Sequence, residues 1–182
     1  MLFRSLSRLG AARGFGVHLV PAVEARDGRP VSSTLIRRAI AGGDLRTAHD
    51  GLGRLYSVSG RVVRGDARGA ALGYRTLNVD IPPAPKLLPP DGVYAVRVRT
   101  PDGPFGGMLS LGGRPTFGDD SRRIEAHLFD TAGDWYGATV QVEFVAWMRN
   151  IETYRDAEAL VAQLRVDEVN ARTILARRRA GL

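Results

Sequence analysis

The sequence predicts a mainly β protein, in which short antiparallel strands form a closed barrel or a sandwich, followed by one terminal helix and preceded by a small α/β segment. Two observations support the strands: apolar and polar residues alternate in short segments after residue 56, and glycine and proline separate these segments. The third observation is a long amphipathic stretch at the end of the chain. With 182 residues, the chain can hold one full domain and a fragment of another.

The first 50 residues predict a helix, a strand and two short helices. Leucines near helical spacing precede Gly14 and Gly16, which should end the first helix, and residues 17–23 predict a short buried strand. Hydroxyl side chains at residues 32–34 should cap a helix that ends at residues 42–43, and a second short helix or turn should follow over residues 44–51. Because the start is rich in arginine and serine and has no acidic residue before Glu24, it also resembles a transit peptide, but the α/β interpretation is favoured.

The predicted strands lie between residues 57 and 145. In the last of them, Val140, Val142 and Phe144 share one face and polar residues share the other. The proline-rich stretch 81–90 should be an extended loop. Residues 156–179 predict one terminal helix, with an apolar stripe through Ala157, Leu160, Val161 and Leu164. The predicted strand segments are 57–63, 93–99, 107–111, 123–129 and 139–145.

Composition excludes several classes of function. The chain has no cysteine, which excludes disulfides and thiolate chemistry and suits a reducing cytoplasm, where we expect the protein. No apolar run approaches the ~20 residues needed to cross a membrane. The net charge of +7 could attract nucleic acid, but Lys86 is the only lysine and no aromatic and basic residues interleave. We therefore expect no specific nucleic-acid partner; a non-specific polyanion-binding barrel is the weaker alternative. We also expect a monomer without a membrane partner.

Glycines and polar side chains cluster in residues 60–80. Gly65, Gly69 and Gly73 recur at a spacing of four after a predicted strand, so the backbone there could approach phosphate oxygens closely. This spacing matches neither the dinucleotide fingerprint nor the P-loop, and a flexible hairpin would explain it equally well. Thr76 and Asn78 are two residues apart, so in an extended segment they point to one side and could share a magnesium ion, unless they simply end a strand.

Glu125 is the candidate for a general base. In the segment 123–129, Ile124, Ala126 and Leu128 define a core face. Glu125 and His127 lie on the opposite, polar face. A carboxylate in this position could accept a hydroxyl proton during phosphoryl transfer. The alternative is an ordinary solvated carboxylate.

Four motifs in order resemble the kinase module of the bifunctional riboflavin kinase and FAD synthetase family. They are the glycine loop leading to Thr76 and Asn78, LGGRPTFG (111–118), IEAHLFD followed by GDWYG (133–137), and the segment 142–164. The resemblance runs from Tyr56 to about Asp167, and the preceding stretch, with VSSTLIR at 31–37, is similar to the end of that family's adenylyltransferase domain. It implies an adenylyltransferase-like α/β remnant over 1–50 and a riboflavin kinase-like barrel with its C-terminal helix over 51–182.

The resemblance implies a six-stranded Greek-key barrel that transfers the γ-phosphate of ATP to riboflavin, giving FMN. The implied partners are small molecules, riboflavin and ATP, and Mg²⁺ is the implied cofactor. The implied site residues comprise the catalytic base Glu125; the Mg²⁺ and phosphate ligands Thr76 and Asn78; the nucleotide-binding residues Gly65, Gly69, Gly73, Leu128 and Tyr136; and the flavin-binding residues Arg149 and Tyr154.

Several positions depart from the family pattern. Arg75 and Leu77 replace a usual proline and alanine, Ala70 replaces a common basic residue, and Ile151 replaces a common acidic one. The alternative function is therefore a catalytically impaired protein that still binds flavin or nucleotide. Residues 1–31 lack the glycine- and histidine-rich nucleotide motif of the adenylyltransferase, so we expect no FAD synthetase activity.

Overall fold

The structure is a computed structural model that describes residues 2–18, 20–25, 28, 30–65, 69, 72–81, 86–113 and 122–179. Its internal contacts divide the chain into two units, Met1–Ser32 and Ser33–Leu182. Ala70 and most of the predicted motif 111–118 lie outside the described residues.

The first unit contains a helix but not the strand that the sequence predicts. Helix α1 spans Leu2–Arg13 and Gly14 follows it with a φ of 74°. The described residues of 17–23 form no strand; nearby, Glu24 and Pro30 form an isolated β-bridge. The prediction was wrong because a strand needs a neighbouring strand for its backbone hydrogen bonds, and the described residues of this unit form only that bridge. Val20 and Val23 are 75% and 69% exposed, as expected for a strand sequence without its sheet.

The two short helices that follow are confirmed, and they pack on the barrel. Helix α2 spans Ser33–Ala41 and helix α3 spans Leu45–Leu52. Buried Ile40, Leu45 and Ala48 belong to the same hydrophobic cluster as the barrel interior. The predicted boundary near residue 50 rests on the idea that residues 1–50 derive from an adenylyltransferase domain. The packing of α2 and α3 does not test this origin, so the boundary stays a prediction.

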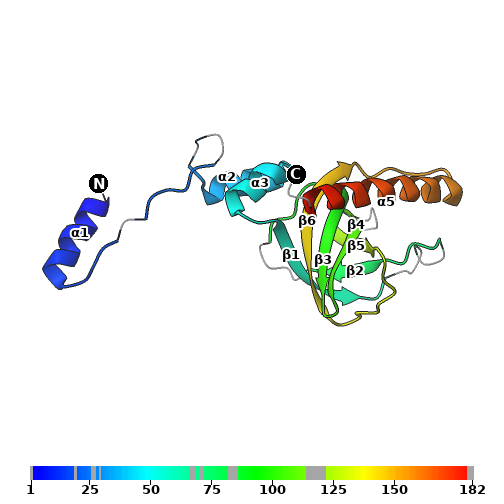
Figure 1. Cartoon of the computed structure of the whole chain (residues 1–182), viewed down its shortest axis with the longest axis horizontal. Helices are drawn as coiled ribbons and strands as arrows, with labels where there is room; N and C mark the ends of the chain where they lie inside the picture. The colour runs from blue at the N-terminus through cyan, green and yellow to red at the C-terminus, as the bar shows by residue number, and fades with distance from the viewer. Residues whose placement is uncertain are drawn as a thin grey trace. The chain divides into compact units, whose positions relative to one another are not determined.

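Six strands close into an antiparallel barrel in the order β1-β2-β5-β4-β3-β6 (Figure 1). Strands β3, β4 and β5 are joined as consecutive hairpins, and β6 returns to pair with β3, which is the Greek-key arrangement. The predicted fold class is thereby confirmed. The strands are β1 (Tyr56–Val63), β2 (Leu77–Asp80), β3 (Gly92–Thr100), β4 (Gly103–Gly113), β5 (Arg122–Leu128) and β6 (Thr139–Arg149).

Period-two alternation decides which side chains fill the barrel. In β6, Val140, Val142 and Phe144 point inward and are almost completely buried, as the sequence predicts. The ring of Phe144 meets Tyr94 edge to face at 5.3 Å between centroids. Tyr94 donates a hydrogen bond to the Pro90 carbonyl, so its hydroxyl is satisfied in the interior.

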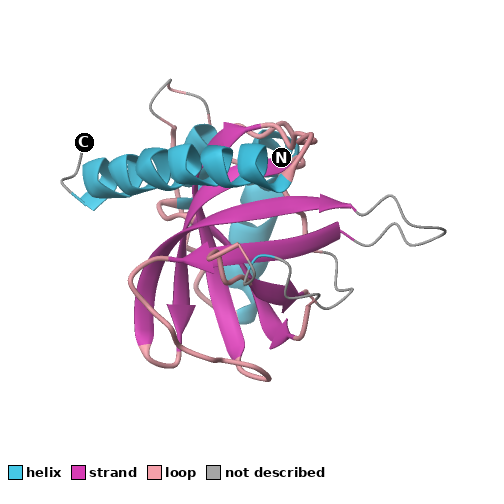
Figure 2. Cartoon of the chain, turned by 90° about the vertical axis from the view of Figure 1, so that its right-hand side faces the viewer, coloured by secondary structure: helices cyan, strands magenta, loops and turns pink. Residues whose placement is uncertain are grey.

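Helix α5 spans Ala157–Arg179, as predicted, and lies across the outside of the barrel (Figure 2). Its buried Ala171 and Leu175 pack against Ala95 of β3 and Met108 of β4. The contact is close, because a Cβ at Gly106 would lie 2.9 Å from the Leu175 side chain. The packing face therefore continues beyond the predicted stripe, whose first member, Ala157, is exposed.

Candidate active site

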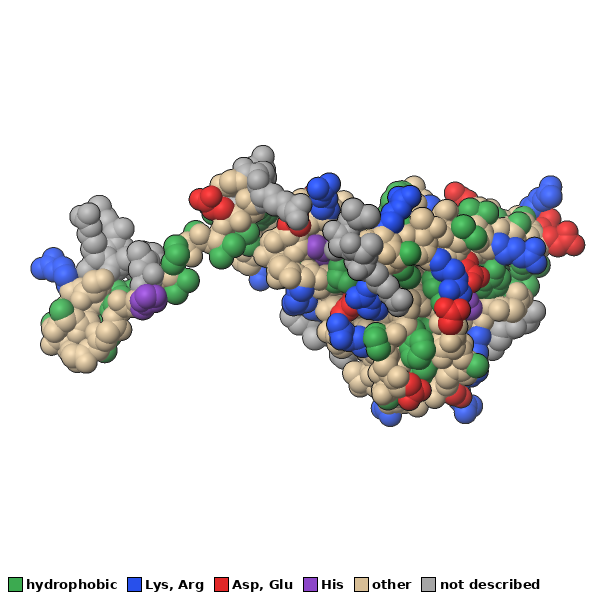
Figure 3. Space-filling view, viewed as in Figure 1, with side chains coloured by type: hydrophobic (Ala, Val, Ile, Leu, Met, Phe, Trp, Pro, Cys, Tyr) green, Lys and Arg blue, Asp and Glu red, His purple; other side chains and the backbone are tan. Residues whose placement is uncertain are grey.

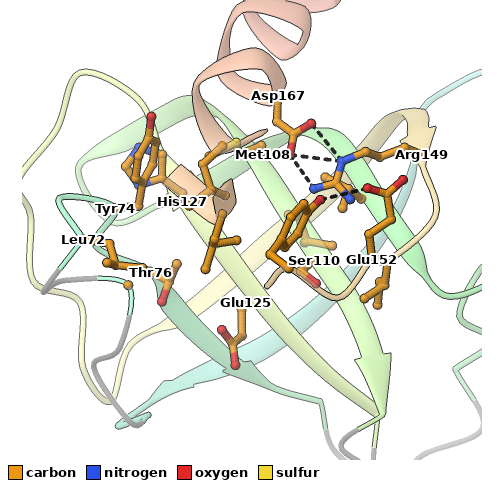
Figure 4. A pocket seen from close by; sticks show the side chains of 17 residues that line it. Leu72, Tyr74, Thr76, Met108, Ser110, Glu125, His127, Arg149, Glu152 and Asp167 are labelled. Atoms are coloured by element: carbon orange, nitrogen blue, oxygen red, sulfur yellow. Dashed lines mark hydrogen bonds and ion pairs between the residues drawn. The ribbon is translucent and has the colours of Figure 1, made fainter. Parts of the chain in front are cut away.

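A pocket of about 260 Å³ lies on the outer face of the barrel, beside helix α5 (Figure 4). Its walls come from four parts of the chain: the glycine loop before β2, strands β3 to β5, the segment that joins β6 to α5, and α5 itself. In Figure 4, Thr76 and Glu125 lie on one side and Arg149 and Asp167 on the other. These elements are distant in sequence, so only the closed barrel assembles them.

The strand register places three of the predicted site residues, Asn78, Glu125 and Arg149, in one cross-strand row. Asn78 of β2 pairs with Glu125 of β5, which in turn pairs with Ser110 of β4. Ser110 pairs with Val93 of β3, and Val93 pairs with Arg149 at the end of β6. Side chains opposite one another on neighbouring strands lie about 4.5–5.5 Å apart at Cβ. Asn78 and Ser110 therefore occupy the positions on either side of Glu125 on the two neighbouring strands.

The glycine loop packs against the amide of Asn78. A Cβ at Gly65 would overlap the Asn78 side chain, so only glycine permits this close approach. Gly73 has a φ of 82°, in the region that favours glycine, and Gly69 lines the pocket. Thr76 also lines the pocket, two residues before Asn78. The structure therefore brings the glycine loop to the predicted phosphate and metal ligands.

Arg149 is held by a buried carboxylate. Its Nε donates to Asp167 Oδ1 at 2.9 Å and its Nη2 donates to Oδ2 at 2.7 Å, while Nη1 donates to the Asn150 carbonyl at 2.9 Å. Asp167 is only 1% exposed and also accepts a hydrogen bond from Gln163. These hydrogen bonds to Asp167 raise the pKa of Arg149 above its usual value. A guanidinium has five N–H donors, so one on each terminal nitrogen remains for a ligand.

Tyr154 lies beside this guanidinium. The Arg149 guanidinium carbon is 5.9 Å from the centre of the Tyr154 ring, and the Tyr154 hydroxyl donates to Glu152 Oε2 at 3.1 Å. Burial raises the pKa of Tyr154, so the phenol stays protonated well above neutral pH. The structure thus brings together the two predicted flavin-binding residues and adds Glu152, and all three line the pocket.

On the side of the glycine loop, the pocket is bounded by the rings of Tyr74 and His127. The rings of Tyr74 and His127 meet edge to face at 5.0 Å between centroids. His127 Nδ1 is 2.8 Å from the Arg75 carbonyl oxygen, which links β5 to the segment before β2. With Leu72 nearby in the lining, these rings offer apolar and aromatic surface for a flat ligand (Figure 4).

Of the five predicted nucleotide-binding residues, only Gly69 lines this pocket, and the predicted metal ligand Asn78 also lies outside its lining. Leu128 is 6% exposed and belongs to the interior cluster, because it points inward in phase with Ile124 and Ala126. Tyr136 is 48% exposed, and the Arg64 guanidinium lies 5.8 Å from its ring centre. The structure does not bring these two residues together with Glu125, and their contact with a nucleotide stays a prediction.

Sequence reasoning missed Asp167, although a signal was present. Asp167 follows Leu164 by three residues and precedes Ala171 by four, so it falls on the packing face of α5. A carboxylate on an apolar helical face needs a partner, and Arg149 is the partner here. Ser110 gave no such signal, because only the strand register places it beside Glu125.

The two departures before and within β2 are accommodated. Arg75 donates a hydrogen bond to the Ala132 carbonyl at 3.3 Å and lies 3.6 Å from Asp134, so it ties the glycine loop to the segment after β5. Leu77 is 7% exposed and fills the barrel interior, where the usual alanine would leave space. Both substitutions thus have structural partners.

The oxygen donors present suit a magnesium ion bound with a phosphate substrate. Among the described residues, no group of three or more histidine, cysteine or carboxylate side chains could hold a metal. Mg²⁺ commonly takes one or two protein oxygens and fills its remaining positions with phosphate and water. The threonine hydroxyl of Thr76 and the amide oxygen of Asn78 are ligands of this kind.

Comparisons with known proteins find similar sequences along most of this chain. Residues 52–175 match the family model described as riboflavin kinase. A bifunctional riboflavin kinase/FMN adenylyltransferase from Escherichia coli K12 is 36% identical over 171 residues, which cover 93% of this chain and 54% of that protein. The corresponding protein of Haemophilus influenzae is 37% identical over 147 residues, covering 80% of this chain and 47% of that protein.

A crystal structure described as a macrolide-efflux protein from Streptococcus pneumoniae superimposes with a TM-score of 0.79 at 36% identity, covering 90% of this chain and 53% of that one. Within the described part of this chain, no helix has the length and apolar character to cross a membrane. The chain spans about half the length of the curated relatives it matches.

Proposed function

Because this chain belongs to the riboflavin kinase family, we propose that it transfers the γ-phosphate of ATP to the terminal ribityl hydroxyl of riboflavin, giving FMN and ADP. The observation that carries the proposal is the strand row in which Glu125 lies between Asn78 and Ser110, beside the pocket that Arg149 and Tyr154 line. This arrangement supports the proposal because a candidate base, candidate phosphate ligands and a candidate flavin site lie in one small region.

The glycine-loop side would hold MgATP. Gly65, Gly69 and Gly73 let the backbone approach the phosphates, and Thr76 and Asn78 supply oxygens to the metal and hydrogen bonds to phosphate. Mg²⁺, when bound, neutralises charge on the β- and γ-phosphates. Gly65 packs directly against the Asn78 amide, and this contact would help to hold the amide in place for the metal and the phosphate.

The opposite side would hold the flavin. The remaining N–H groups of Arg149 can donate to the carbonyl oxygens of the isoalloxazine ring, and the protonated phenol of Tyr154 offers a face for stacking. Asp167 keeps the guanidinium in one orientation. The ribityl chain would then extend along the row toward Glu125.

Glu125 would act at the reacting hydroxyl. A primary hydroxyl is a poor nucleophile, so its oxygen needs a base that orients the attack on the γ-phosphorus and accepts the proton as the O–P bond forms. The bond from the γ-phosphorus to the bridging oxygen breaks, and ADP leaves with the electron pair. Ser110, opposite Glu125 in the register, can hydrogen-bond the same hydroxyl.

No observation favours the alternative of an impaired binding protein, because Arg75 and Leu77 both have structural partners. We also propose that the chain acts on small molecules as a cytoplasmic monomer, without a specific nucleic acid or a membrane. It should not convert FMN to FAD, since residues 1–31 contain no glycine- and histidine-rich nucleotide motif.

The test is to incubate the protein with riboflavin and MgATP and to quantify FMN, ADP and FAD by chromatography. We expect FMN and ADP in equal amounts, no FAD, and loss of turnover when EDTA removes the metal. Riboflavin binding without FMN formation would instead support the impaired binding protein. Neither binding nor turnover would contradict both functions.

A further inference from the structure

A second concave surface lies on the outside of β1, β6 and β3. This groove of about 570 Å³ shares no lining residue with the pocket beside α5. Two cross-strand rows form its floor. In the first, Ser57 pairs with Glu143 and Glu143 with Arg97; in the second, position 59 pairs with Gln141 and Gln141 with position 99.

The groove carries a local excess of positive charge. Its lining includes four cations, Arg54, Lys86, Arg97 and Arg99, and one carboxylate, Glu143, which gives a formal net charge of +3. Among the residues that the structure describes, only Arg99 is paired with that carboxylate, through Nε to Oε1 at 2.7 Å.

The other three cations have no carboxylate partner among the described residues. Arg54 donates to the Leu55 carbonyl, Lys86 lies 5.1 Å from the ring centre of Tyr56, and Arg97 has no hydrogen-bond acceptor in the described part of the chain. Like charges gathered in this way repel one another, and a bound anion would relieve the repulsion.

The floor is ordered and polar. Ser57 and Glu143 are only 6% and 8% exposed, and Gln141 Nε2 donates to Ser57 Oγ at 3.2 Å. Arg97 and Arg99 are two residues apart on β3, so both side chains leave the same face of the barrel. These two guanidinium groups therefore extend from a polar surface of buried side chains, and their N–H groups can bind one anionic ligand.

We propose that this groove binds a condensed phosphate of two or three phosphoryl groups, either free or carried by a nucleotide, at a site separate from the active-site pocket. The net charge of +3 matches the charge of such a ligand, and guanidinium groups bind phosphate oxygens in pairs. A groove of this volume fits a small molecule. A long polynucleotide is disfavoured, because acidic side chains lie among the basic ones on the face of the barrel unit seen in Figure 3.

The test is a titration of ¹⁵N-labelled protein with sodium tripolyphosphate at low salt without magnesium, followed by NMR. We expect saturable shifts of the backbone amides of Ser59, Arg97 and Gln141. The triple variant Arg54→Gln, Lys86→Gln, Arg97→Gln should weaken this binding roughly tenfold or more, because charge-assisted contacts are lost. The matched control Arg37→Gln, Arg38→Gln, Arg165→Gln removes the same charge at exposed positions outside the groove and should change it less than about threefold.

Parallel titrations with ATP and orthophosphate distinguish the sources. A nucleotide ligand should shift these amides at lower concentration with ATP than with tripolyphosphate, a free condensed phosphate should give the reverse order, and orthophosphate should bind most weakly. Equal weakening in both triple variants would overturn the proposal, since it would show only general charge attraction. Shifts confined to residues of the active-site pocket would also overturn it.

Discussion

Glu125 is the residue on which the proposed chemistry depends most directly. It faces the pocket from the middle of β5, and general bases typically contribute about 10² to 10⁴ in rate. We therefore expect Glu125→Gln to lower FMN formation by a factor in that range, while riboflavin still binds because Arg149 and Tyr154 are unchanged. Rate and binding can be measured by chromatography and flavin fluorescence.

Glu158→Gln, an exposed change in the first turn of α5, is the matched control and should leave the rate unaltered. If Glu125→Gln were as active as the parent, Glu125 would not be the base.

Asp167 acts through Arg149 and is a positioning residue. Asparagine keeps the size of the side chain but removes its charge and one acceptor oxygen, so the guanidinium would lose its bidentate partner. For Asp167→Asn we expect the KM for riboflavin to rise about tenfold or more, with a smaller change in kcat and an unchanged KM for ATP. Steady-state kinetics with each substrate varied checks this.

Asp167→Glu should restore part of the riboflavin affinity, because it returns the carboxylate. A fall in kcat with an unchanged KM for riboflavin would contradict the positioning role. A merely structural defect would change the values for both substrates together.

At the scale of single elements, the N-terminus of α3 shows how a local cap links to pH. Asp44 Oδ1 accepts a hydrogen bond from the Thr47 backbone N–H at 3.0 Å. Hydrogen bonding from the side chain and then from the backbone of Thr47 lowers the pKa of Asp44 below its usual 3.8. We expect Asp44→Ala to reduce the free energy of unfolding by about 1 kcal/mol, and Asp44→Asn to reduce it much less, because asparagine also caps. Urea unfolding measures both.

The sign of the pH dependence follows from the lowered pKa. The ionised Asp44 contributes its stability fully above the unfolded carboxyl value of 3.8, and that contribution is lost as the pH falls through the lower folded pKa. The difference in unfolding free energy between the parent and Asp44→Asn should therefore shrink between pH 5 and pH 2. A constant difference over that range would show that the charge plays no part.

Strand β2 is the element that alternation did not reveal. It has four residues, Leu77–Asp80, and directly follows a glycine loop, so it offers too few positions for a clear period of two. Its pairing with both β1 and β5 closes the barrel and carries Asn78 to Glu125. The number of strands was predicted only through the resemblance to the family.

At the scale of the whole molecule, the two units should differ in stability. The described apolar side chains of α1, Leu6 and Leu9, are more than 40% exposed, whereas α2 and α3 contribute buried Ile40, Leu45 and Ala48 to the barrel cluster. Hydrogen exchange depends on the free energy of local opening. We expect amides of α1 to exchange rapidly and those of α2 and α3 to be protected nearly as well as the barrel, which mass spectrometry can resolve by segment.

Protection of α1 equal to that of β3 would contradict this expectation. Exchange of α3 as fast as that of α1 would show that the helices do not share the barrel's stability.

The sequence by itself determined the β class, most strand positions, the terminal helix, the candidate ligands Thr76 and Asn78 and the candidate base Glu125, because alternation, helical periodicity and short motifs are local properties of a chain. Tertiary structure decided the failure of the strand at 17–23, which lacks a neighbouring strand, and the inward position of Leu128. It also decided which distant residues meet, since register across closed strands depends on the whole barrel. Asp167 beside Arg149 is the clearest case: a helix packed across strands pairs two charges 18 residues apart.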